Sequence, residues 1–123
     1  MKGIEYDTSK TGFNVVLKDW QLKAMEAVWT STNGANSRTV YAKVNQVLKG
    51  ETISRASVIN YLEDMRKMEV LSGEEVTGKG GHHWVYSPKL DEAGFKRFII
   101  EKMLTCLMDS FPEETREAIK KLR

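Results

Sequence analysis

The sequence predicts a mainly α-helical fold with one small β-hairpin, and three observations support this class. Apolar residues recur three and four positions apart along most of the chain, which is the spacing of amphipathic helices. Between residues 70 and 88, two short β-branched and aromatic runs instead flank a glycine-rich turn. The chain has 123 residues, of which 41% are hydrophobic, enough for one compact domain with a short appendage.

The first predicted helix follows a weakly periodic lead-in. Residues 1–16 form this lead-in, and the run from Gly12 to Leu17 at its end suits a short strand or an extended segment. Residues 18–31 then predict a helix with Trp20 and Val28 on its apolar face and Asp19 as its N-cap. The polar stretch TNGANS closes this helix.

Two further helices are predicted before the hairpin. The second begins at Asn36 or Ser37 and ends near Gly50, with valines on one stripe. The third has Ser54 as its N-cap and packs through one apolar stripe. Its members are Val58, Leu62 and Met65. The opposite face begins with short side chains, and the acids Glu63 and Asp64 come later in the helix.

The hairpin and the C-terminal helices complete the predicted elements. Strands form around Val70-Leu71 and Trp84-Val85-Tyr86, and Pro88 stops the second one. A long helix runs from about Asp91 to Ser110, and a short one follows with Ser110 as its N-cap.

Three helices followed by a hairpin is the element order of a winged helix, a variant of the helix-turn-helix. We therefore expect residues 1–16 to be an N-terminal lead-in and residues 17–90 to be a winged-helix DNA-binding domain with a β-hairpin wing. Residues 91–123 are expected to form a C-terminal helical dimerisation region.

The charge distribution favours nucleic acid as the partner. The net charge is only +2, but residues 37–60 carry four basic residues against one acid. In a helix-turn-helix the N-terminal half of the second helix enters the major groove. This predicts that double-stranded DNA bases are read by Arg55, Ala56, Ser57 and Asn60. Contacts to the DNA backbone are predicted for Ser37, Arg38, Thr39, Lys43, Ser54 and, at the hairpin tip, Lys79.

The long C-terminal helix is apolar around more than one stripe. A chain of this length has little core left to cover a second apolar face, so we expect a homodimer. The predicted interface residues are Ile99, Ile100, Met103, Leu104, Leu107, Met108 and Phe111. The alternative is a helix buried entirely within its own domain.

The composition disfavours several other classes of protein. The single Cys106 excludes an internal disulfide and a multi-cysteine zinc site, and the adjacent His82 and His83 point to opposite faces of a strand. We expect no enzyme activity, metal or cofactor. No apolar run approaches the ~20 residues of a membrane span, and the N-terminus does not resemble a signal peptide. A cytoplasmic, nucleoid-associated prokaryotic protein is therefore expected.

Three stretches carry a resemblance to a known family. LKDWQLKAMEAVW, SVINYLEDMRKMEVL and HHWVYSPKL together resemble the penicillinase and methicillin-resistance repressors of the BlaI/MecI type, from about Leu17 to Phe111. The chain departs from that family at Lys18, where a capping Thr is frequent, and at Glu69, where a helix-ending Gly is common. The resemblance thus identifies a divergent relative.

The resemblance implies a winged-helix repressor that binds a palindromic operator as a dimer. Two other functions stay open on the sequence alone. One is a winged helix that contacts an acidic protein partner, and the other is a replication or partition protein that binds DNA without regulating transcription.

Overall fold

The structure, a computed structural model, describes residues 3–48, 50, 52–78 and 81–122. The chain divides into two compact units, Met1–Asp91 and Glu92–Arg123. The first unit contains, in order, η1 (Gly12–Val15), α1 (Asp19–Trp29), β1 (Ala35–Asn36), α2 (Ser37–Val47), α3 (Arg55–Lys67), β2 (Leu71–Gly78) and β3 (Gly81–Pro88). The second contains α4 (Glu92–Ser110) and α5 (Pro112–Lys121). The predicted class, mainly helical with a small hairpin and C-terminal helices, is confirmed.

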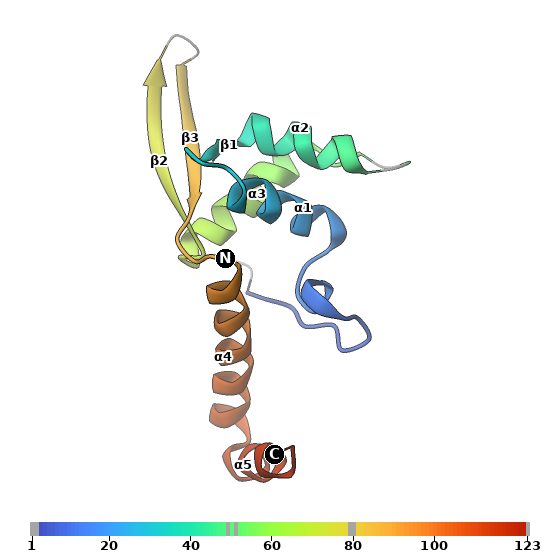
Figure 1. Cartoon of the computed structure of the whole chain (residues 1–123). Helices are drawn as coiled ribbons and strands as arrows, with labels where there is room; N and C mark the ends of the chain where they lie inside the picture. Colours follow the sequence, from blue (N-terminus) through green and yellow to red (C-terminus); the bar gives the residue numbers. More distant parts are fainter. Residues whose placement is uncertain (1–2, 49, 51, 79–80, 123) are drawn as a thin grey trace. The chain divides into compact units, whose positions relative to one another are not determined.

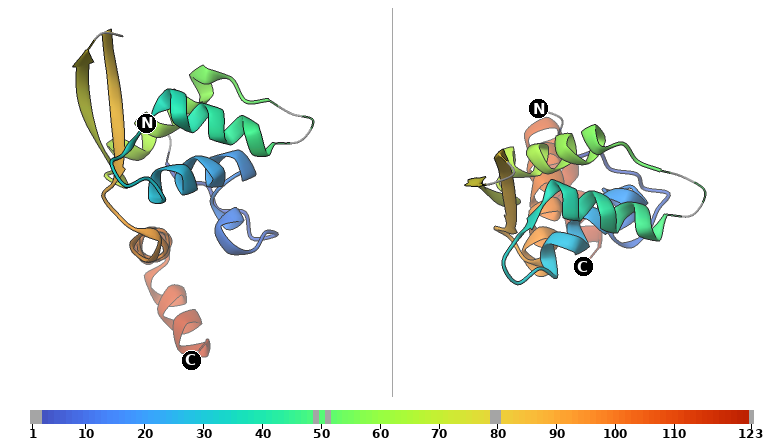
Figure 2. Two further views of the ribbon diagram at one scale, coloured as in Figure 1. Left: turned by 45° about the horizontal axis from the view of Figure 1, so that its top comes forward. Right: turned by 90° about the horizontal axis from the view of Figure 1, so that it is seen from above.

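Helices α1, α2 and α3 pack around one core beside the hairpin (Figures 1 and 2). The apolar stripe predicted for the third helix is confirmed, since Val58, Leu62 and Met65 are all buried. Tyr61 is buried with them, and its ring meets Trp20 edge-on at 5.4 Å between centroids. Three helices followed by a hairpin is consistent with a generic winged-helix domain.

The entry to α1 differs from the prediction. Gly12–Val15 forms a 3₁₀ turn, not a strand, and Asp19 is the first helical residue and not the N-cap. Lys18 precedes the helix in an extended conformation, and its backbone N–H donates to Gln21 Oε1 at 2.9 Å. Asp19 Oδ1 instead accepts from Asn14 Nδ2 at 2.9 Å, so the acid ties the 3₁₀ turn to the helix.

The sheet has a third strand that the sequence did not reveal. β2 and β3 pair antiparallel from Leu71–Pro88 to Gly78–Gly81, and the short β1 pairs with the other edge of β3. Gly34 precedes β1 with φ +84 and lies directly against β3. A Cβ at Gly34 would be 2.6 Å from Val85 Cγ1, so only glycine lets β1 approach this closely.

Helix α3 ends at a non-glycine residue with a positive φ. Glu69 takes the left-handed conformation, φ 65, that glycine usually supplies after a helix. Its N–H donates to Arg66 O, and the Val70 N–H donates to Met65 O, both at 3.0 Å. Lys89 Nζ lies 2.9 Å from Glu69 Oε1 and lowers the pKa of that carboxyl. The ion pair joins the end of α3 to the residue after β3.

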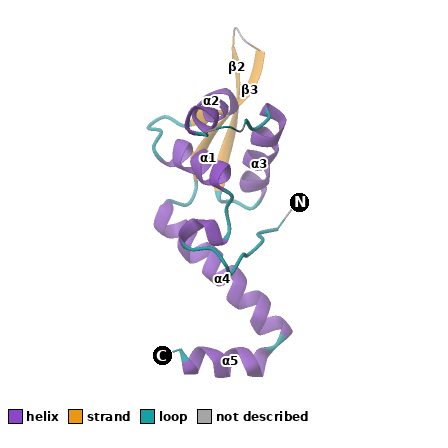
Figure 3. Ribbon diagram, turned by 90° about the vertical axis from the view of Figure 1, so that its right-hand side faces the viewer, coloured by secondary structure: helices purple, strands orange, loops and turns teal. Residues whose placement is uncertain are grey.

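In the second unit, α4 leads into α5 through a sharp bend (Figure 3). Phe111, not the predicted Ser110, precedes α5, and Pro112 occupies its first turn as expected. Leu107 O at the end of α4 accepts from the Phe111 N–H at 2.7 Å and from Thr115 Oγ1 at 3.0 Å, so the Thr115 hydroxyl links α5 to the last turn of α4. Among the described residues, no helix combines the length and apolarity needed to cross a membrane.

Candidate nucleic-acid interface

The Asn45 side chain joins α2 to the residue that precedes the N-cap of α3. Asn45 on α2 accepts from the Ile53 N–H at 2.8 Å, and its Nδ2 lies 3.2 Å from Ile53 O and 3.1 Å from Tyr41 O. Ile53 comes directly before the N-cap of α3. Asn45 therefore sets where the third helix begins relative to the second.

The predicted cap of α3 is confirmed. Ser54 Oγ accepts from the Ser57 backbone N–H at 3.1 Å, which satisfies one of the free donors of the first turn. The Ser54 and Ser57 hydroxyls also share a hydrogen bond of 2.9 Å. Both residues stay exposed, so each hydroxyl keeps further hydrogen-bonding capacity toward a ligand.

The four residues predicted to read bases lie together in the N-terminal half of α3. Arg55, Ala56, Ser57 and Asn60 are all exposed, whereas the other face of the same turns is buried through Val58. Within the described part of the chain, Arg55 has no ion-pair partner. The helix thus presents a guanidinium, an amide and two short side chains outward.

The predicted backbone contacts on α2 also lie at its surface. Arg38, Thr39 and Lys43 are exposed and Ser37 is half-buried. Neither Arg38 nor Lys43 is paired with an acid among the described residues. Asn36 caps this helix by accepting from the Thr39 N–H at 2.8 Å. Lys79, predicted at the hairpin tip, lies outside the described residues.

Glu63 does not behave as its sequence position indicated. The sequence analysis placed it on the helix face opposite the apolar stripe. In the structure it is half-buried and accepts from Arg66 Nη2 at 2.8 Å and from Tyr86 Oη at 2.7 Å. The bonds from Arg66, and then that from Tyr86, lower the pKa of Glu63. Its charge is compensated inside the protein.

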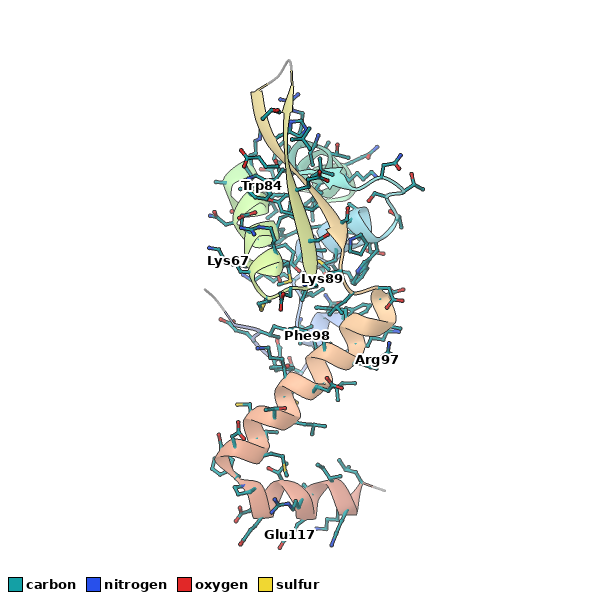
Figure 4. All side chains as sticks on the ribbon, turned by 90° about the vertical axis from the view of Figure 1, so that its left-hand side faces the viewer. Lys67, Trp84, Lys89, Arg97, Phe98 and Glu117 are labelled. Carbon is teal, nitrogen blue, oxygen red and sulfur yellow. The ribbon has the colours of Figure 1, made fainter. Side chains whose placement is uncertain are left out.

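The hairpin contributes an aromatic residue to the same place. The Arg66 guanidinium lies 4.8 Å from the Trp84 ring centroid, a cation–π distance. Figure 4 labels Trp84 where α3 runs beside the hairpin. Sequence reasoning missed these contacts because Trp84 and Tyr86 lie far from Glu63 and Arg66 in the chain. The i,i+3 spacing of Glu63 and Arg66 was the one available signal.

The predicted dimer residues, which lie on α4 and at the Phe111 junction that follows it, differ in exposure. Ile100 and Phe111 are 56% and 59% exposed, and Leu104 and Leu107 are also exposed, whereas Ile99, Met103 and Met108 are half-buried. On α5, Ile119 and Leu122 add exposed apolar surface that the sequence analysis did not single out. The second unit thus carries apolar side chains that face solvent in a single chain.

No metal-binding group emerges from the described residues, in which no three His, Cys, Asp or Glu side chains cluster at ligand distance. His83 is exposed on β3.

No protein-family model matches the chain, and no curated protein matches it.

Proposed function

We propose that the protein is a sequence-specific, double-stranded DNA-binding transcriptional regulator, a repressor that acts as a homodimer on a palindromic operator and has no catalytic activity. One observation carries the proposal. The N-terminal half of α3 is exposed and presents Arg55, Ser57 and Asn60, while the opposite face of that helix is anchored in the core.

The side chains exposed on the N-terminal half of α3 suit the major groove. A guanidinium can donate two hydrogen bonds to guanine, and an amide can pair with the N6 and N7 edge of adenine. Ala56 and Ser57 are short, so the helix axis can approach the base pairs closely. The acid that would oppose this approach, Glu63, is already neutralised by Arg66.

The exposed cations on α2 suit the flanking phosphates. Arg38 and Lys43 have no acidic partner among the described residues, so each is available to a phosphate. Two protomers would bring four such charges to the operator. Counterion release then gives a slope of about −3.6 for log affinity against log salt from these residues alone.

A homodimer fits the exposed apolar residues of the second unit. Ile100 and Leu104 on α4, and Phe111 between α4 and α5, would be covered by the same surface of a second copy. Each protomer would then present one α3 to one half-site, with half-site centres about 10 base pairs or a multiple apart. The resemblance to the penicillinase repressors supports the same arrangement, in a divergent relative with its own operator.

The decisive experiment is selection of bound sequences from a random pool of duplex DNA. We expect a two-fold symmetric site, bound about 150-fold more weakly at 200 mM than at 50 mM salt. Arg55→Ala should relax the base preference, whereas Lys43→Ala should weaken all sequences alike and reduce the salt slope by about two per dimer. An unenriched pool, with no binding at low salt, would overturn the proposal.

One observation favours a different partner. Glu74 is exposed on β2, where an acidic side chain would be repelled by nearby phosphates. A winged helix that contacts a protein tolerates such a residue. Retention of a protein partner by a chain that shows no affinity for duplex DNA would support that second function.

A further inference from the structure

We call the β2–β3 hairpin the wing. Arg66 lies at the centre of the contacts between α3 and the wing. Arg66 grips Glu63 with two nitrogens, Nη2 at 2.8 Å from Oε1 and Nε at 3.1 Å from Oε2. Its guanidinium plane also lies over the Trp84 ring at 4.8 Å. The bidentate pair orients Arg66 along α3, and the ring contact joins that orientation to β3.

A second link runs from the same acid to the wing. Tyr86 Oη donates to Glu63 Oε2 at 2.7 Å, and Tyr86 is buried at the base of β3. Burial and the bond to Glu63 both raise the pKa of Tyr86, so the hydroxyl stays protonated and remains a donor. Glu63 therefore receives hydrogen bonds from its own helix and from the wing.

The other strand of the wing makes room for this arrangement. Gly73 on β2 pairs with Tyr86, and a Cβ there would be 2.5 Å from Arg66 Cδ and 3.2 Å from Trp84 Cε3. The absence of a side chain lets the Arg66 stem pass against the sheet. The wing cluster, defined as Glu63, Arg66, Gly73, Trp84 and Tyr86, thus draws on α3, β2 and β3.

We infer that Glu63 and Arg66 are positioning residues that hold the wing at a set angle to the recognition helix. The inference rests on the proposed function, because that angle determines how far along a duplex the wing reaches when α3 lies in the groove. It also assigns a role to an acid and a base that would otherwise count as a repelling and an attracting group for phosphates. Their charged groups interact with each other and with Trp84 and Tyr86 of the wing.

The first test measures the wing in the free protein. Spin labels are attached through Asn60→Cys on α3 and Thr77→Cys on β2, with the chain's single cysteine removed by Cys106→Ser. Pulsed electron resonance then gives the distribution of distances between the labels. Glu63→Gln and Arg66→Lys, which keep size or charge but lose the bidentate ionic pair, should broaden it clearly.

Asp64→Asn provides the matched control, because it removes the same charge one residue away from a side chain that has no hydrogen bond or ion pair in the described structure. It should leave the distribution unchanged. Tyr86→Phe is measured in parallel, since it deletes one oxygen and leaves the core packing in place. An unaltered distribution in Glu63→Gln and Tyr86→Phe would overturn the inference.

The second test uses DNA and unlabelled protein. Hydroxyl-radical footprints of Glu63→Gln should lose protection at the outer edges of the site, while the base preference set by α3 and the protections at the half-site centres remain. Asp64→Asn should give the full footprint. A protein that binds no duplex overturns the proposed function but leaves the distance measurement valid. Full outer protection in Glu63→Gln overturns the positioning role.

Discussion

The approach of β1 to β3 makes Gly34 the most sharply testable position in the first unit. Alanine at this position must keep φ near +84, which costs an L-residue about 1–2 kcal/mol. Restricting the unfolded chain recovers about 0.4–1 kcal/mol. The new Cβ would also lie 2.6 Å from Val85 Cγ1 and 2.9 Å from Ser87 Oγ, so β1 or β3 must move.

Such overpacking adds about 1–3 kcal/mol, which brings the expected destabilisation by Gly34→Ala to about 2–4 kcal/mol. Urea unfolding at fixed protein concentration measures it directly. Gly12→Ala is the matched control, because Gly12 also has a positive φ, +60, but no atom within 4 Å of the added Cβ. The control should lose only about 1 kcal/mol.

The difference between the two variants isolates the steric term. If Gly34→Ala and Gly12→Ala unfold at the same urea concentration, the close packing of β1 on β3 contributes nothing and the reasoning is refuted. A larger loss for Gly34→Ala shows that β1 and β3 pack too closely to admit a methyl group between them.

Four further changes test other features of the chain. Ser54→Ala removes the α3 cap and should cost about 1 kcal/mol in urea unfolding; an unchanged midpoint would contradict that role. Because the folded protein lowers the pKa of Glu63, its stabilising contribution is complete above about pH 4.5 and is lost as the pH falls below that value. Acid unfolding should therefore show a shallower pH dependence for Glu63→Gln than for the unmodified protein or Asp64→Asn, and three parallel curves would contradict this. Glu69→Gly should raise the thermal midpoint by about 2–5 °C by relieving a left-handed residue, and a lower midpoint would show that the lost ion pair outweighs the backbone gain. Ile100→Glu should convert the proposed dimer to a monomer in sedimentation velocity, a shift that cannot occur if the unmodified chain already sediments as a monomer.

Local periodicity was sufficient to predict the helices and the hairpin. The stripe of Val58, Leu62 and Met65 and the cap at Ser54 depend on residues within a few positions of one another, and the structure confirms them. Pro88 likewise ends β3 as expected, because proline cannot donate to the ladder.

The features that escaped prediction depend on partners far away in the chain. Two residues of β1 carry no periodic signal, and their pairing rests on the position of β3 fifty residues later. Glu63 looked like a solvated acid because its partner Tyr86 belongs to the wing. The roles of Arg55 and Asn60 remain proposals, since exposure on α3 is compatible with DNA but does not identify it.

The hydrogen bonds between Asn45 and Ile53 have a consequence for insertions between α2 and α3. Its amide engages both backbone groups of Ile53, just as an adjacent β-strand would, so one side chain registers the start of the next helix. An insertion directly ahead of position 53 should therefore leave the N-terminal half of α3 in place, which makes this junction suitable for a reporter.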